Sequence, residues 1–395
     1  MSTFQHNAPW RHTKRLALVI SFVQFANALE YMAFNPLFAF MAVDFTVPVS
    51  WSGYVSGLYT LGAVISGFSA FFWLGRINKK RFLIINMALL GMLTGFTTLT
   101  THFETLLILR FCAGAIGGTT MAAAIGLLIN QTPVNLRGRM FATVIAAFSA
   151  VSIAGMPGIL FLCTHYGWQL ALYAIALLCL LSVPLILLAV PADNSSEQTV
   201  QRPMLKAETL LFASANALVQ FSPMLIVPVL VPLLTQRLGL PSDLLPLIFI
   251  VGGVAGYLAT KMTGRLLTFC SIPRLAIAST LLFVLSLVLP ATGYAGPVLF
   301  MILFLGTSYS RLVISSVVTM AFPDDRQRAG FVSLQTSLMH LLTTVAFFLC
   351  PLLLGENDMA AGSVNRLLLF AAAAAAIIPL YLAVLQKKLR QRDRC

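Results

Sequence analysis

The most regular feature of the chain is a succession of long apolar runs separated by short polar segments. Each run holds about 20 residues with few charges, which is the length an α-helix needs to cross a bilayer. The pattern therefore predicts an all-α membrane protein with about twelve transmembrane helices. The runs cover residues 16–43, 52–74, 82–101, 105–130, 140–163, 168–190, 207–235, 243–264, 274–293, 296–321, 329–353 and 364–386.

One long polar stretch, residues 191–206, divides the twelve runs six and six. We therefore predict an N-terminal six-helix bundle at 1–190, a cytoplasmic linker at 191–206 and a C-terminal six-helix bundle at 207–395. The halves also read as copies of each other at an offset of 189 residues. The matching positions are Gly67-x7-Gly75-Arg76 with Gly256-x7-Gly264-Arg265, and Asn27 with Asn216. Two pseudo-symmetric repeats of six helices are how several classes of transporter enclose a central site.

The composition agrees with a chain that faces lipid. Hydrophobic residues make up 59% of the sequence and charged residues 9%, against about 25% charged residues in soluble domains. The net charge of +13 does not indicate nucleic-acid binding, because the basic residues stand in small clusters between the apolar runs. The six cysteines form no CxxC or Cys/His spacing. We expect no metal, no cofactor and a monomer in the bilayer.

The basic residues also predict the topology. Twenty of the 25 Lys and Arg fall in loops and tails on one side of the alternating runs, and only Arg237 and Arg366 fall in loops on the other. Cytoplasmic loops carry the excess of Lys and Arg. We therefore expect a bacterial-type inner membrane location, with both termini in the cytoplasm.

Glu30 is the only acidic residue deep inside an apolar run. A carboxylate is costly there, so such residues are functional candidates by default. A carboxyl group that ionises when wetted and is protonated when enclosed can carry a proton. Arg110, near the outer end of the fourth run, is the candidate partner that holds the anion. The alternatives are a structural ion pair for Glu30 and an arginine that snorkels to the interface for Arg110.

Other polar side chains recur on single faces of the predicted helices. In the first run Gln24, Asn27 and Glu30 or Tyr31 share one helical face, and Asn216 with Gln220 repeat the pattern in the seventh. Such faces would line a wet cavity that takes a substrate, or they would make interhelical hydrogen bonds. Nearby aromatic residues would suit a moderately apolar ligand. They are Phe25, Tyr31, Phe34 and Tyr59.

Two further polar residues lie in the second half. His340, in the eleventh run, is a candidate proton relay or a packing donor. Arg311, in the tenth run, has no acidic partner in its own run. It is a candidate contact for an anionic group of the substrate, or a structural arginine.

Several motifs together resemble the major facilitator superfamily over nearly the whole chain. Within that superfamily the sequence resembles the drug:proton antiporter-1 group, and above all its sugar-efflux and purine-efflux branch. The segments that carry the resemblance are LEYMAFNPL at 29–37, SGYVSGLYTLGAVISG at 52–67, LGRINKKR at 74–81 (the family's motif A), LRFCAGAIGG at 109–118 (motif B), GMPG at 155–158 (the core of the antiporter motif) and GWQLALY at 167–173. Motif A usually has an aspartate where this chain has Gly75.

The resemblance implies conformational roles for the loops and helices that carry these motifs. The candidate latch residues are Gly67, Gly75, Arg76, Lys79 and Lys80, with Gly155 and Pro157 from the antiporter motif. The alternative is that the basic residues of loop 75–81 only set the orientation of the helices in the membrane.

These features predict a secondary transporter that exports a small molecule in exchange for protons, with Glu30 and Arg110 at the proton-coupling site. Uptake by symport would use the same residues. A membrane-embedded enzyme is the other class of function. It would need convergent catalytic groups, but the short loops contain no HExxH, no paired carboxylates and no glycine-rich phosphate loop.

Overall fold

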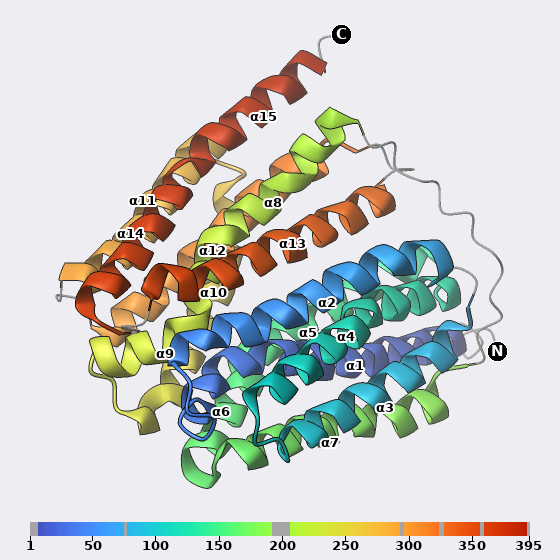
Figure 1. The fold of residues 1–395 in the computed structure, drawn as a ribbon. Helices are drawn as coiled ribbons and strands as arrows, with labels where there is room; N and C mark the ends of the chain where they lie inside the picture. The colour runs from blue at the N-terminus through green and yellow to red at the C-terminus, as the bar shows by residue number, and fades with distance from the viewer. Residues whose placement is uncertain are drawn as a thin grey trace. The chain divides into compact units, whose positions relative to one another are not determined.

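The computed structural model describes residues 7–74, 77–191, 206–292, 296–323, 328–355 and 359–392. These residues form helices joined by turns, with no strand in the described ranges. Each of the twelve predicted apolar runs coincides with one helix or with consecutive helical pieces (Figure 1). The predicted all-α membrane fold is confirmed.

Ten helical stretches of the described residues are long and apolar enough to cross a membrane. The helices α2 (Ser52–Trp73) and α3 (Lys79–Thr97) are not among the ten. Helix α3 begins with three basic residues, which lowers its mean hydropathy.

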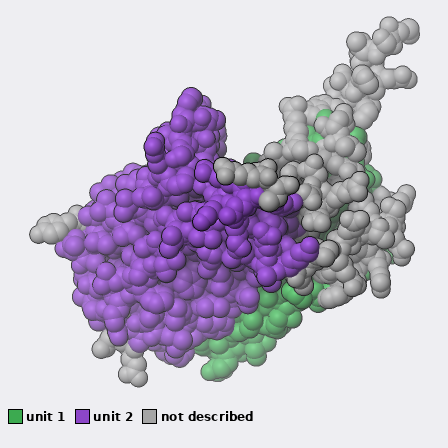
Figure 2. All heavy atoms as spheres, turned by 90° about the horizontal axis from the view of Figure 1, so that it is seen from above, with its two compact units in different colours: residues 1–40, 58–199 green, residues 41–57, 200–395 purple. Residues whose placement is uncertain are grey.

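The chain divides into two compact units (Figure 2). The first comprises residues 1–40 and 58–199, and the second comprises residues 41–57 and 200–395. Most of the sequence-predicted linker 191–206 lies outside the described residues. The division of the chain at that linker stays a prediction.

The first unit is built from the long helices of the N-terminal half. In it α3 packs against both α4 and α7. Gly91 of α3 permits the contact with α7, since a Cβ on this residue would lie 2.8 Å from Leu180 Cγ. The unit contains α1 (Asn7–Met41), most of α2, α3, α4 (Phe103–Gln131), α5 (Val134–Ala150), α6 (Met156–Tyr166) and α7 (Trp168–Ala189).

Glycines bring α2 and α4 into backbone contact. A Cβ on Gly114 of α4 would overlap the carbonyl oxygen of Tyr59, and one on Gly118 would lie 2.6 Å from Ala63 Cα. From the other side, a Cβ on Gly62 of α2 would overlap the carbonyl oxygen of Phe111. Small residues at a helix crossing let two backbones approach closely inside a membrane. This crossing fixes the position of Tyr59 along the axis of α4.

We expect Gly114→Ala to destabilise the first unit, because the added methyl group meets backbone atoms that cannot rotate away. Overpacking of this kind typically costs about 1–3 kcal/mol, which should lower the Tm of the purified protein. The matched control is Gly158→Ala in α6, where nothing lies within 4 Å of the added Cβ. An unchanged Tm for Gly114→Ala in a thermal unfolding scan would contradict the close crossing.

The fifth span changes its helical winding before a proline. Between α5 and α6 lies a single π turn, η3 (Val151–Gly155), and Pro157 follows in the first turn of α6. Proline has no N–H to donate to the carbonyl four residues earlier, and such π turns are frequent at functional sites. A Cβ on Gly155 would lie 3.0 Å from Leu29 Cδ1 and 3.2 Å from Phe25 Cζ. Gly155, the first residue of the GMPG segment, therefore lies directly against α1.

The second unit is built around α8 and α12. Helix α8 packs on α12 and α13, α12 packs on α10 and α11, and α11 packs on α14. A core of buried residues such as Phe212, Ile314 and Leu382 joins α8, α12 and α15. The helices are α8 (Ala207–Ile226), α10 (Leu245–Leu266), α11 (Ile272–Thr292), α12 (Pro297–Met320), α13 (Arg328–Leu354), α14 (Ala361–Ala376) and α15 (Ile378–Arg392).

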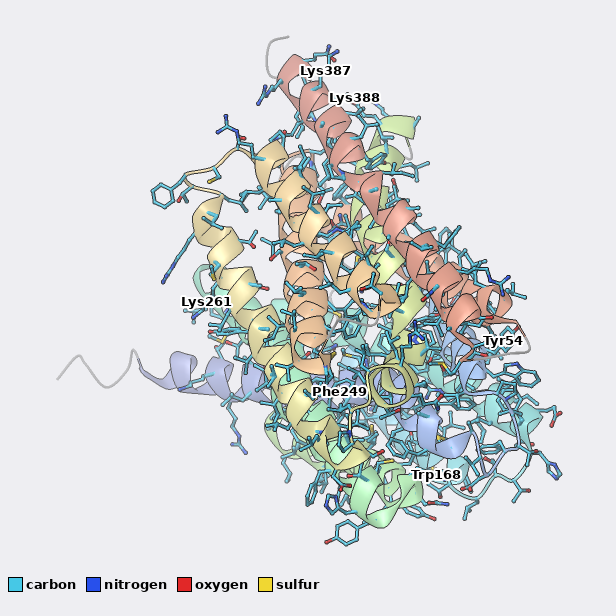
Figure 3. The ribbon with its side chains drawn as sticks, turned by 90° about the vertical axis from the view of Figure 1, so that its left-hand side faces the viewer. Tyr54, Trp168, Phe249, Lys261, Lys387 and Lys388 are labelled. Carbon is cyan, nitrogen blue, oxygen red and sulfur yellow. The ribbon has the colours of Figure 1, made fainter. Side chains whose placement is uncertain are left out.

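The basic end of α15 carries part of the positive charge from which the sequence predicts the topology. Lys387 and Lys388 stand on its last turns (Figure 3). Nearby, Arg392 Nη1 donates a hydrogen bond to the carbonyl oxygen of Phe322 at 2.8 Å.

The seventh span is broken by prolines. After α8 the chain passes through η4 (Val227–Val229), the short α9 (Leu230–Pro232) and η5 (Leu233–Arg237). Pro223, Pro228 and Pro232 each remove a backbone donor. The carbonyl of Pro228 accepts a hydrogen bond from Ser52 Oγ at 2.6 Å.

Residues 41–57 belong to the second unit. Besides the hydrogen bond from Ser52 to Pro228, two further contacts join them to it. A Cβ on Gly53 would overlap the carbonyl oxygen of Phe347 and lie 2.8 Å from Pro351 Cδ. The rings of Tyr54 (labelled in Figure 3) and Phe348 have centroids 5.9 Å apart. The start of α2 therefore packs with α13, although it belongs to the N-terminal half of the sequence.

Candidate functional site

Glu30 and Arg110 form a buried ion pair in the first unit. Arg110 Nη1 of α4 donates a hydrogen bond to Glu30 Oε1 of α1. The side chain of Glu30 is 0% exposed and that of Arg110 is 1% exposed. The two charged residues that stand out in the apolar runs of the N-terminal half therefore meet. Arg110 does not snorkel to an interface, because its side chain is enclosed. The role of the pair in proton coupling stays a prediction.

Two aromatic rings hold the guanidinium group of Arg110. Its Cζ lies 3.6 Å from the ring centroid of Phe34 and 4.4 Å from that of Tyr59. The ring of Tyr59 in turn stacks on Tyr31, with centroids 5.1 Å apart and an angle of 24° between the planes. A cation over an aromatic face in a dry site is stabilised by about 2 kcal/mol. Arg110 therefore has a binding site that does not depend on Glu30 alone.

The ion pair leaves hydrogen-bonding capacity unused. Glu30 Oε2, Arg110 Nε and Arg110 Nη2 have no hydrogen-bond partner among the described residues. Buried polar atoms without partners are uncommon and costly. The free carboxyl oxygen and the free guanidinium N–H groups can therefore bind a further donor or acceptor.

The remaining polar residues of α1 lie beside this pair. Gln24 and Asn27 are buried, and their side-chain carbonyl oxygens have no partner in the described part of the chain. A Cβ on Gly117 of α4 would lie 3.1 Å from Asn27 Oδ1 and would overlap the Tyr59 hydroxyl. The absence of a side chain at Gly117 therefore makes room for both polar groups. Their role as substrate contacts stays a prediction.

The matching polar face in the second unit is partly used for helix packing. Asn216 Nδ2 of α8 donates to Ser316 Oγ of α12 at 3.0 Å, while Asn216 Oδ1 has no partner among the described residues. Gln220 and His340 are half-buried on α8 and α13. The carbonyl of His340 accepts a hydrogen bond from Thr344 Oγ1. Contacts of these residues with a substrate stay predictions.

Arg311 is buried in the second unit at 2% exposure. Its guanidinium lies over the ring of Phe283, with 4.4 Å between Cζ and the ring centroid. It borders a narrow gap together with residues of α11 and α15. Its neighbours therefore come from α11 and α15 as well as from its own helix.

The predicted latch residues have separate surroundings. Gly75 and Arg76 lie outside the described residues, and nothing lies within 4 Å of a Cβ placed on Gly67. Lys79 is buried, and its aliphatic chain lies 3.3 Å from a Cβ placed on Gly126. Lys80 Nζ donates to the carbonyl oxygens of Leu187 and Val190. Lys80 thus caps the carboxyl end of α7 within the first unit, where the helix dipole favours a positive charge.

Sequence patterns alone do not identify two features of the site. The patterns place Phe34 and Tyr59 near a ligand, but in the structure both rings enclose Arg110. They also do not identify Tyr59 as the residue that Gly114 and Gly117 contact. The small-residue spacing of α4, with Gly114 and Gly118 four residues apart, is the signal from which the close crossing could be predicted.

Comparisons with known proteins agree with this architecture. Residues 20–349 match the family model of the Major Facilitator Superfamily. The chain is 25% identical over 258 residues to a protein of Streptomyces lividans called a chloramphenicol resistance protein. This match covers 62% of this chain and 64% of the relative's length, so the chain spans a little under two thirds of that relative.

Solved transporter structures share the fold. A bacterial homologue of the human lysosomal transporter Spinster, in an inward-facing and unoccupied conformation, superimposes with a TM-score of 0.71 at 12% identity, covering 97% of both chains. The nucleoside transporter NupG gives 0.73 at 13% identity over 94% of this chain and 99% of that one. The POT family transporter PepTSo gives 0.77 at 9% identity over 96% and 98%.

Proposed function

Because this chain belongs to the major facilitator superfamily, and is therefore a membrane transporter rather than an enzyme, we propose that it exports a small molecule in exchange for protons. The observation that carries the proposal is the enclosed Glu30–Arg110 pair between α1 and α4. An ionisable pair inside a membrane is costly and marks ion or proton pathways.

The coupling follows from the chemistry of the pair. Ionised Glu30 is held by Arg110, which also rests on Phe34 and Tyr59. Protonation of Glu30 removes the charge attraction but leaves the guanidinium on its two rings. While Glu30 is ionised, its unpartnered Oε2 can accept a hydrogen bond from a hydroxyl or amide group of the substrate, and protonation of the carboxyl group weakens this acceptor. Substrate and proton then compete for one carboxyl group, which is the requirement for exchanging one for the other.

The direction and the branch are supported by the relatives and the motifs. We place the chain in the drug:proton antiporter-1 group, in the branch that resembles sugar and purine exporters, on the segments at 29–37, 109–118 and 155–158. The Streptomyces relative is named for resistance to chloramphenicol, and export of a drug is one way in which resistance arises. Chloramphenicol is therefore the first substrate to test. We expect a monomer in a bacterial inner membrane with both termini in the cytoplasm.

Inverted membrane vesicles with an acidic interior test this function. Their outer face is the cytoplasmic face, so an exporter that exchanges protons should accumulate labelled chloramphenicol inside. One proton moving down 100 mV supplies about 2.3 kcal/mol, which supports roughly a 40-fold gradient of a neutral solute.

The same vesicles distinguish antiport from symport. A proton-sensitive dye in the vesicle interior should report a loss of acidity when substrate is added. Accumulation only when the exterior is acidic would show uptake by symport instead. Substrate movement that is insensitive to either gradient would refute proton coupling.

A further inference from the structure

Arg311 is a buried cation that lacks a counter-charge in the part of the chain that the structure describes. All three nitrogens of its guanidinium group have no hydrogen-bond partner there, and the salt bridge recorded for the described residues involves other side chains. The side chain is 2% exposed. An arginine stays charged in proteins, and a buried charge is costly unless it is paired and hydrogen-bonded.

The guanidinium borders a gap between three elements of the second unit. The gap is lined by Ala276, Ser279 and Thr280 of α11, by Arg311 and Ile314 of α12, and by Ile378 and Leu382 of α15. The lining contains no carboxylate, and its polar side chains are the guanidinium and two hydroxyl groups. These groups donate hydrogen bonds, and only the hydroxyl oxygens can also accept them.

Two further unused donors lie on α11 and α12. Thr280 Oγ1, which lines the gap, has no hydrogen-bond partner among the described residues. Ser315 Oγ, one helical turn after Arg311 on α12, has none there either. The three guanidinium nitrogens of Arg311 and the hydroxyl groups of Thr280 and Ser315 can all donate hydrogen bonds. None of them has an acceptor among the described residues.

We propose that the gap between α11, α12 and α15 binds a small monovalent inorganic anion, such as chloride, held by Arg311 and the Thr280 hydroxyl. The ion would supply both the missing negative charge and the missing acceptor. This site differs from the Glu30–Arg110 pair, which belongs to the other unit, and the inference does not depend on proton coupling or on the direction of transport.

The size of the gap decides which anion fits. As it stands, the gap admits no sphere the size of a water molecule. A bound ion would therefore displace the Arg311 side chain from its position in this structure, and a single-atom ion requires a smaller displacement than sulfate or phosphate does.

The depth argues against a lipid headgroup. Arg311 lies nine residues before the end of α12 at Met320, which is about 14 Å at 1.5 Å per residue. Thr280 lies eight residues after the start of α11 at Ile272, or about 12 Å. A phosphate at the helix ends would have to descend that distance into the hydrocarbon layer.

Thermal unfolding of the purified full chain in a neutral detergent tests the site. Sodium gluconate is replaced stepwise by sodium chloride at constant ionic strength. A ligand that binds only the folded state raises Tm in a saturable manner, and we expect a rise on the order of 2 °C. Arg311→Gln, which removes the unpaired charge, should fold and lose the chloride response.

Thr280→Val provides a milder variant if Arg311→Gln does not fold. Loss of one hydrogen bond should weaken the apparent chloride affinity about fivefold. The matched control is Thr260→Val in α10, whose hydroxyl bonds the carbonyl of Gly256 in its own helix, and its chloride response should equal that of the parent protein.

Three outcomes would overturn the proposal. The first is a Tm that does not change when chloride replaces gluconate. The second is a chloride response that survives in Arg311→Gln or is unchanged in Thr280→Val. The third is stabilisation by added phosphatidylglycerol without any effect of chloride, which would assign Arg311 to a lipid headgroup.

Discussion

Replacing Glu30 by glutamine is expected to abolish proton-driven accumulation of substrate while leaving exchange down a substrate gradient intact. Glutamine has nearly the shape of a protonated glutamate, and its carbonyl oxygen can still accept from Arg110 Nη1. It cannot release a proton, so the step that couples the gradient to the substrate is lost. The rocking of a transporter between its two states need not require ionisation of this residue.

Proteoliposomes with an imposed pH difference measure both activities. We expect the variant to accumulate no substrate above the level of liposomes without protein, and to retain counterflow of labelled against unlabelled substrate. Substrate addition should change the number of protons bound to the parent protein and not the number bound to the variant.

The control for this experiment makes the same chemical change at an exposed position. Glu104 lies in the first turn of α4, six residues before Arg110, and its side chain is exposed. Glu104→Gln should keep accumulation and counterflow at the level of the parent protein. Gradient-driven accumulation by Glu30→Gln at the parent rate would show that Glu30 is structural, and would direct attention to His340 as the proton carrier.

Replacing Arg110 by lysine is expected to reduce transport at least about tenfold, although the positive charge is kept. The guanidinium of Arg110 is planar and contacts Glu30 and the faces of Phe34 and Tyr59. A lysine ammonium is a compact, strongly hydrated charge that cannot stack on two rings and donate along a fixed direction at the same time. Glu30 should therefore be held in a different position, and the linkage between proton and substrate should fail.

The measurement is substrate flux per amount of protein in the membrane, so that expression and transport are separated. Arg366→Lys in α14 is the matched control, because Arg366 is exposed. Its Nη2 donates a hydrogen bond to Ser363 Oγ in the same helix, at 3.2 Å. It should retain full flux. Full flux in Arg110→Lys would mean that Arg110 acts through its charge alone.

A double substitution separates stability from coupling. Removing one partner of a buried ion pair leaves an uncompensated charge, whereas removing both does not. We therefore expect the double variant Glu30→Gln with Arg110→Met to show a smaller decrease in Tm than the sum of the decreases caused by the two single substitutions. Proton-driven accumulation should remain lost, since both residues of the proposed coupling pair are absent. A Tm equal to that sum would show that the two side chains do not stabilise each other.

The sequence was sufficient to predict the membrane spans and the two unusual charges. All twelve apolar runs are helical in the structure, because a stretch of about 20 apolar residues in lipid must satisfy its backbone hydrogen bonds internally. Glu30 and Arg110 stand out in the sequence because a charge in an apolar run is rare. The internal offset of 189 residues likewise needs no structure.

Other features depend on which side chains the folded helices bring together. Hydropathy measures the transfer cost of each residue by itself. It does not show that Arg110 rests on Phe34 and Tyr59, or that Arg311 has no described counter-charge. These facts arise from the rotation of each helix about its axis and from close crossings such as that at Gly114. The sequence by itself therefore determined which segments enter the membrane and where charge is buried. Only the tertiary structure decided how each buried charge is balanced, because balance depends on contacts between helices far apart in the chain.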